Sequence, residues 1–125
     1  MKELILCFGN PYIKEDSLAV EIGKELKKQN YNIKICGSGD EILNIKRKKI
    51  FILDVAENIK KATIIKNLDI LESKKACSAH DIDLLFFLKL LKEIGKAREI
   101  IIIGIPAKGI KKKVIKDIKS LPLNL

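Results

Sequence analysis

Three side chains in this sequence could hold a metal ion or transfer protons: Asp16, Asp54 and His80. Asp16 follows a Gly-Asn-Pro loop, Asp54 directly follows an apolar run, and His80 is the only histidine. Two carboxylates and one imidazole suit a divalent transition metal, because imidazole binds nickel or zinc and carboxylate oxygens can complete the shell. A metal held by three groups keeps open positions, so it can accept a ligand from another molecule.

Each of the three residues also has an ordinary structural role that the sequence leaves open. Asp16 could cap a helix, as aspartate often does. Asp54 could accept backbone hydrogen bonds at a turn, although a buried carboxylate is costly unless it is paired. A single histidine is often structural, but His80 begins a predicted helix, whose dipole disfavours protonation and so favours metal binding.

Other catalytic arrangements fit the sequence less well. Cys77 and His80 are three residues apart at a predicted helix start, which does not guarantee that they face each other, and no third orienting group is evident. A dinucleotide-binding loop needs three spaced glycines after the first strand, but Cys7, Gly9 and Tyr12 occupy those positions. The G-x-S-x-G turn of Ser-His-Asp hydrolases is also absent from the sequence.

Hydrophobic periodicity predicts strands and helices that alternate along the chain. Strands are expected at residues 4–8, 31–35, 50–53, 62–71 and 99–105, and helices at 17–29, 40–45, 78–94 and 110–118. The run 50–53 is expected to be a central strand that stops at Asp54, and the weaker segment 62–71 an edge strand. The pattern predicts one α/β domain over residues 1–125, a three-layer αβα sandwich around a mostly parallel sheet of about five strands.

The predicted fold explains why the three polar residues belong together. In open parallel sheets, ligands bind outside the carboxyl ends of the strands. Asp16, Asp54 and His80 all lie in loops that would open on that edge.

Composition limits the classes of protein that this chain can represent. Its 125 residues are 47% hydrophobic, which excludes general disorder, and no apolar run approaches the length of a membrane span. No signal peptide is visible, so we expect a cytoplasmic protein without membrane insertion. Cys7, Cys36 and Cys77 are widely scattered, which favours reduced, buried thiols over disulfides.

The formal net charge of +9 raises the question of nucleic-acid binding. The basic runs are short, at 46–49 and 111–113, and no aromatic residues interleave them as a stacking surface would require. A solvated basic surface is therefore favoured over a nucleic-acid site, and such a surface could steer an acidic protein partner.

Four motifs follow one another along the chain. The first is Gly-Asn at residues 9–10, then four variable residues and an acidic pair at 15–16. The second is the apolar strand that ends in Asp54. The third is Ser-x-His at 78–80 before an apolar stretch, and the fourth is the apolar run 100–103 followed by Gly-Ile-Pro. In this order, the four motifs resemble those of the hydrogenase maturation endopeptidases.

The resemblance implies an aspartic-type endopeptidase that removes the C-terminal extension of a [NiFe] hydrogenase large-subunit precursor. It implies that Asp16, Asp54 and His80 contact the nickel already inserted in that precursor, although another divalent metal in the isolated protein stays open. A precursor without nickel would offer no metal to bridge the two proteins, so cleavage would wait for insertion. The loop and substrate-approach residues implied are Gly9, Asn10, Glu15, Gly37, Ser38 and Gly39.

Several positions depart from the family pattern. Cys7 and Ala19 stand where the family usually has glycine, and the loop 37–39 lacks the family's acidic residue, which leaves the choice of substrate open. The short chain resembles a compact archaeal version. The alternative is a non-catalytic basic binding module that holds the precursor or a nucleic acid.

Overall fold

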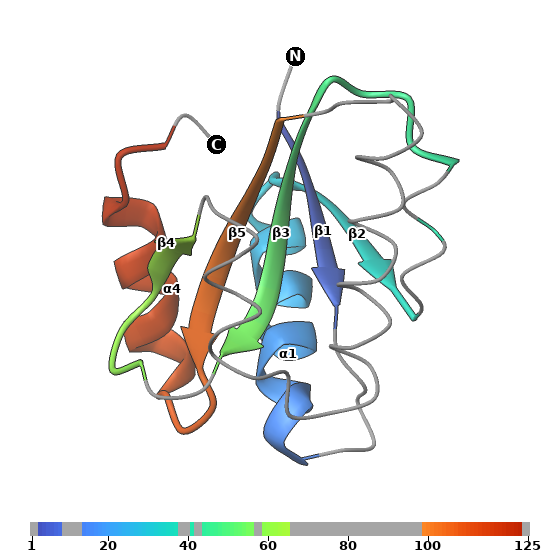
Figure 1. Cartoon of the computed structure of the whole chain (residues 1–125). Coiled ribbons are helices and arrows are strands. Elements are labelled where there is room, and N and C mark those ends of the chain that lie inside the picture. Colours follow the sequence, from blue (N-terminus) through green and yellow to red (C-terminus); the bar gives the residue numbers. More distant parts are fainter. Residues whose placement is uncertain are drawn as a thin grey trace.

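The computed structural model describes residues 3–8, 14–37, 41, 44–56, 59–65 and 99–123. In chain order these residues form β1 (Leu4–Phe8), α1 (Lys14–Lys28), β2 (Asn32–Cys36), β3 (Lys49–Ala56), β4 (Thr63–Ile65), β5 (Glu99–Pro106) and α4 (Lys111–Ser120) (Figure 1). Residues 40, 42 and 43 of the helix predicted at 40–45 lie outside the described residues, and the helix predicted at 78–94 lies wholly outside them.

The five strands form one sheet in the order β2-β1-β3-β5-β4. β1 pairs in parallel with β2 and β3, and β3 pairs in parallel with β5, whereas β4 runs antiparallel to β5. The predicted α/β fold with a mostly parallel five-stranded sheet is confirmed. The weak segment predicted at 62–71 forms an edge strand at Thr63–Ile65, and its remainder lies outside the described residues.

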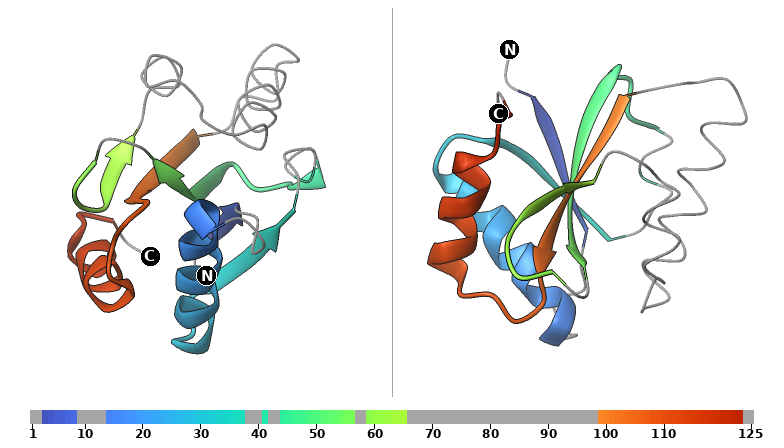
Figure 2. Two further views of the ribbon diagram at one scale, coloured as in Figure 1. Left: turned by 90° about the horizontal axis from the view of Figure 1, so that it is seen from below. Right: turned by 60° about the vertical axis from the view of Figure 1, so that its left-hand side comes forward.

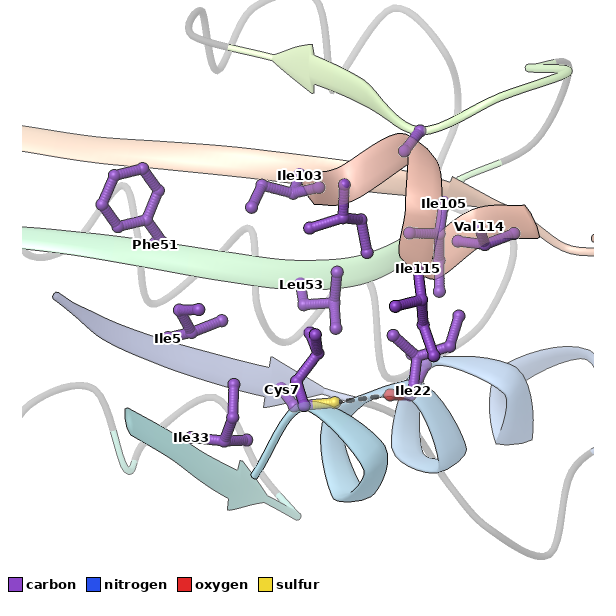
Figure 3. Close-up of a cluster of buried hydrophobic side chains, with 14 of the residues drawn as sticks. Ile5, Cys7, Ile22, Ile33, Phe51, Leu53, Ile103, Ile105, Val114 and Ile115 are labelled. Atoms are coloured by element: carbon purple, nitrogen blue, oxygen red, sulfur yellow. Dashed lines mark hydrogen bonds between the residues drawn. The ribbon is translucent and has the colours of Figure 1, made fainter. Parts of the chain in front are cut away.

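The central strand β3 is buried on both faces. Phe51 and Leu53 pack with the apolar sides of α1 and α4 (Figure 3). Ile50 and Ile52 belong to a second buried cluster on the opposite face. The two helices lie side by side on one face of the sheet (Figure 2). Within the described ranges, no helix is long and apolar enough to cross a membrane.

Two element boundaries differ from the sequence prediction by three residues, and both concern candidate site residues. β3 does not stop at Asp54, because its pairing with β5 continues to the pair Ala56–Pro106. α1 begins at Lys14, three residues earlier than expected, which places Asp16 in its first turn. The apolar periodicity of this helix starts only at Leu18, so it could not mark a polar first turn.

Cys7 of β1 packs closely against α1. Its Sγ donates a hydrogen bond to the backbone oxygen of Ala19 at 2.9 Å (Figure 3). A Cβ added at Gly23, one turn along α1, would lie 2.8 Å from Cys7 Sγ. The two departures from the family's glycines, Cys7 and Ala19, are therefore in contact with each other, and Gly23 leaves room for the thiol.

Both cysteines in the described part of the chain are buried and free of disulfides, as predicted. Burial raises the pKa of the Cys7 thiol to about 12, and the charge of Asp54 adds to this effect. Burial also raises the pKa of the Cys36 thiol to about 11, with a smaller contribution from Glu41. Both thiols therefore stay protonated at neutral pH.

Gly23→Ala is expected to lower the free energy of unfolding by about 1–2 kcal/mol, because the added methyl group overpacks against Cys7 Sγ. Alanine is otherwise favoured over glycine in a helix by about 0.5–1 kcal/mol, so the sign of the change tests the contact. Urea denaturation measures it. The penalty should shrink in a Cys7→Ala background, and an unchanged penalty there would show that the thiol is not its cause.

Cys7 and Cys36 should resist alkylation by iodoacetamide in the folded protein at pH 8 and react once the chain is unfolded, which peptide mass spectrometry can resolve. Folding raises both pKa values above the ordinary thiol value of 9.0. Their contribution to stability is therefore complete below about pH 9 and is lost as the pH rises through the folded-state values. Rapid labelling of native Cys7 at pH 8 would contradict this account.

Candidate functional site

The strand order creates a topological switch point between β1 and β3. The chain leaves β1 through α1 to reach β2 on one side, and it later enters β3 on the other side of β1. In sheets of this kind, ligands bind at the switch point, outside the carboxyl ends of the two strands. The candidate site therefore lies at the carboxyl ends of β1 and β3, at the foot of the sheet in Figure 1.

Asp54 lies on β3 at this switch point. It is 8% exposed and is the one buried charged side chain in the described part of the molecule. Strand alternation puts it on the same face as Ile50 and Ile52, opposite to α1 and α4. Its partner in register on β5 is Gly104, which has no side chain, and β1 pairs with β3 only as far as Leu53. The carboxylate is therefore flanked by a glycine on one strand and by the end of another.

The surroundings of Asp54 favour a functional role for its carboxylate. Its Oδ1 accepts a hydrogen bond from the Val55 backbone N–H at 2.9 Å. A buried carboxylate costs stability unless it is compensated, and such groups concentrate at functional sites. The alternative of a role at a turn is not supported, because β3 continues for two residues beyond Asp54.

Glu15 and Asp16 are the second and third residues of α1, which begins at the carboxyl edge of the sheet (Figure 1). The fold thus brings the backbone of Asp16 to the same edge as Asp54. Asp16 lies inside the helix and does not precede it, so it does not occupy the N-cap position that the capping alternative requires.

The remaining predicted site residues outside the described part are Gly9, Asn10, Ser38, Gly39 and His80. Among the residues that the structure describes, no three His, Cys, Asp or Glu side chains form a group that could hold a metal ion. Neither the Asp16 side chain nor His80 falls in that part. The three-residue set with Asp54 therefore stays a prediction.

Gly37 directly follows β2, whose last residue, Cys36, pairs with Phe8 at the end of β1. It therefore lies at the carboxyl edge, where the resemblance puts a substrate-lining loop. The Gly37 N–H donates a hydrogen bond to Glu41 Oε2 at 2.6 Å, and a Cβ added at Gly37 would meet no atom within 4 Å. Glu41 is not among the residues predicted from the sequence, since only the folded turn brings its carboxylate back to Gly37.

These features define a doubly wound α/β protein with a carboxylate at its ligand-binding edge. No protein-family model matches the chain, and no curated protein sequence matches it. Solved structures do match, and several of them are hydrogenase maturation proteases. The chain is similar to HybD from Thermococcus kodakarensis, with 27% identity and a TM-score of 0.73, over 98% of this chain and 100% of that one.

Two more distant structures have the same fold. The hydrogenase maturating endopeptidase HybD from E. coli is 19% identical, with a TM-score of 0.66, over 91% of this chain and 79% of that one. The maturation protease HycI from T. kodakarensis KOD1 is 19% identical, with a TM-score of 0.61, over 92% and 86%. The resemblance predicted from the sequence motifs is confirmed.

Gly37→Ala should leave the melting temperature unchanged, because the space beside this glycine is open. Glu41→Ala should instead speed amide hydrogen exchange at Gly37 by about fivefold, the effect of losing about 1 kcal/mol of hydrogen bonding. Glu41→Gln keeps an oxygen acceptor and serves as the matched control. Equal exchange at Gly37 in the wild type and in Glu41→Ala would show that this hydrogen bond does not hold the turn.

Proposed function

We propose that this protein is an endopeptidase that removes the C-terminal extension from the nickel-loaded large-subunit precursor of a [NiFe] hydrogenase. The observation that carries the proposal is the similarity to HybD from T. kodakarensis, which extends over nearly the whole of both chains. The position of Asp54 adds independent support, because a buried carboxylate at the switch point is suited to a ligand and unsuited to a purely apolar core.

In this proposal Asp54 presents its carboxylate to the nickel ion that the precursor carries. The low dielectric around a buried group strengthens its attraction for a cation. A side chain on a central strand is also held more rigidly than one on a loop. Asp16 and His80 complete the contact in the roles that the resemblance implies, and Gly9, Asn10, Glu15, Gly37, Ser38 and Gly39 surround the substrate.

The nickel belongs to the substrate, and it links the state of the precursor to cleavage. A precursor that lacks nickel gives Asp54 and its partners no cation to bind, so it is held weakly and is not cut. Proteolysis then follows metal insertion. No resident cofactor of the protease is needed for this dependence.

The reaction breaks one C–N bond of the precursor and consumes one water molecule. The hydroxyl of the water adds to the carbonyl carbon, and a proton goes to the leaving amine nitrogen. A carboxylate within hydrogen-bond reach of that water can accept its proton and return it to the amine. Asp16 and Asp54 are the residues proposed for this step, which makes the enzyme aspartic in type.

The alternative of a non-catalytic basic binding module is not favoured, because the similar structures are those of endopeptidases. The cytoplasmic location and the archaeal origin expected from the sequence stay predictions.

The test is a cleavage assay on a nickel-loaded large-subunit precursor, with the nickel-free precursor alongside. Wild-type protein should release the C-terminal peptide only from the nickel-loaded form. Asp54→Asn should lower the rate by at least about 100-fold, because the charge that binds the cation and accepts the proton is lost. Mass spectrometry of the precursor gives both results.

Asp117→Asn is the matched control, since it makes the same chemical change on α4, away from the switch point. It should cleave at the wild-type rate. Asp54→Asn keeps an oxygen acceptor for the Val55 N–H, and its melting temperature, measured alongside, shows whether a loss of rate comes from unfolding. Full activity of Asp54→Asn would remove this residue from the mechanism, and wild-type binding without cleavage would move the protein to the non-catalytic alternative.

A further inference from the structure

The turn between β5 and α4 carries a compact basic surface that the proposed chemistry does not use. We call the lysine surface the five exposed residues Lys108, Ile110, Lys111, Lys112 and Lys113. Ile110 is 71% exposed, which is unusual for a large apolar side chain next to a helix. Four positive charges thus surround one exposed apolar residue within six positions of the chain.

The fold holds the lysine surface rigidly at the carboxyl edge of the sheet. β5 runs parallel to β3, and α4 starts where β5 ends, so the surface lies at the same end of the molecule as the switch point (Figure 1). The Gly109 N–H donates to the Pro106 oxygen at 3.3 Å. A Cβ at Gly109 would lie only 2.6 Å from Val114 Cγ2, so this turn is tightly packed. α4 lies on the face opposite to the Asp54 side chain, so a partner would reach Asp54 by passing over the edge.

The lysines at the start of α4 lie where their positive charge destabilises that helix in the free protein. Lys111, Lys112 and Lys113 form the first turn of α4, which contains no acidic residue, and Ile110 at the N-cap provides no side-chain hydrogen bond. Cations there oppose the helix dipole, whereas acidic residues would complement it. The described part of the chain supplies no ion pair to any of these lysines. Within that part, no ion pair therefore offsets the unfavourable interaction of these lysines with the helix dipole.

We propose that the lysine surface docks an acidic segment of the large-subunit precursor, with Ile110 against an apolar side chain of that segment. The proposal rests on the proposed function and names the chemistry of the substrate beyond the cleaved bond. An acidic partner would neutralise charges that are exposed in the free protein. Because the turn is already tightly packed, it would lose little conformational entropy on binding. The lysine surface has no aromatic residue on which bases could stack, so an acidic protein fits it better than a nucleic acid.

The test compares two triple variants with the same change in net charge. Lys111→Gln, Lys112→Gln and Lys113→Gln together should raise the KM for the nickel-loaded precursor about tenfold and leave kcat unchanged. Lys24→Gln, Lys27→Gln and Lys28→Gln together remove three exposed lysines near the other end of α1, at the opposite edge of the sheet. That control should change KM less than twofold. A higher salt concentration should raise the KM of the wild type and change that of the 111–113 variant much less.

A second variant separates docking from stability. Ile110→Ser introduces a favourable N-cap residue and should raise the melting temperature while it also raises KM. The 111–113 variant should likewise melt no lower than the wild type, since it removes three positive charges from the first turn of α4. A rise in KM without a loss of stability excludes unfolding as its cause.

The outcomes distinguish this inference from the function on which it rests. A wild type that neither binds nor cuts the precursor overturns the proposed function and the docking with it. Normal cleavage with an unchanged KM in the 111–113 variant overturns the docking alone, as does an equal rise in both triple variants. Tighter binding of the wild type to a DNA or RNA oligonucleotide than to the precursor, lost in the 111–113 variant, would show a nucleic-acid surface instead.

Discussion

The parallel pairing of β3 with β1 and β5 is the constraint on which the rest of this structure depends. In register, Ile5 lies beside Phe51 and Phe51 beside Ile101, so three apolar strands form the buried centre of the sheet. Because these strands run the same way, their carboxyl ends reach one edge of the sheet together. The first turns of α1 and α4 arrive at that edge as well, and distant parts of the chain are gathered there.

Asp54 is in conflict with this apolar centre. The strand around it is built of isoleucine, leucine and phenylalanine, and an apolar side chain at its position would continue the pattern. A carboxylate there must be compensated by hydrogen bonds, of which the bond from Val55 N–H is one. Conflicts between a local residue and the global fold are expected at functional sites, where stability is given up for chemistry.

The same residue type has opposite effects on the two helices. Lys27 and Lys28 lie in the last turn of α1, where they favour the helix dipole, whereas Lys111–Lys113 lie in the first turn of α4, where they oppose it. The basic charge of the protein is therefore more than a general property of its composition. The lysines at the end of α1 stabilise their helix, whereas those at the start of α4 do not.

For the elements that the structure describes, the sequence by itself determined which segments are strands and helices, because apolar periodicity is local and is written in the order of residues. It also singled out Asp54 and the carboxyl edge, since a carboxylate after an apolar run is visible without a structure. It could not show that β3 passes beyond Asp54 to Ala56, that Cys7 contacts Ala19, or that Glu41 holds Gly37. Only the tertiary structure decided these, because strand order and register depend on contacts between residues far apart in the chain.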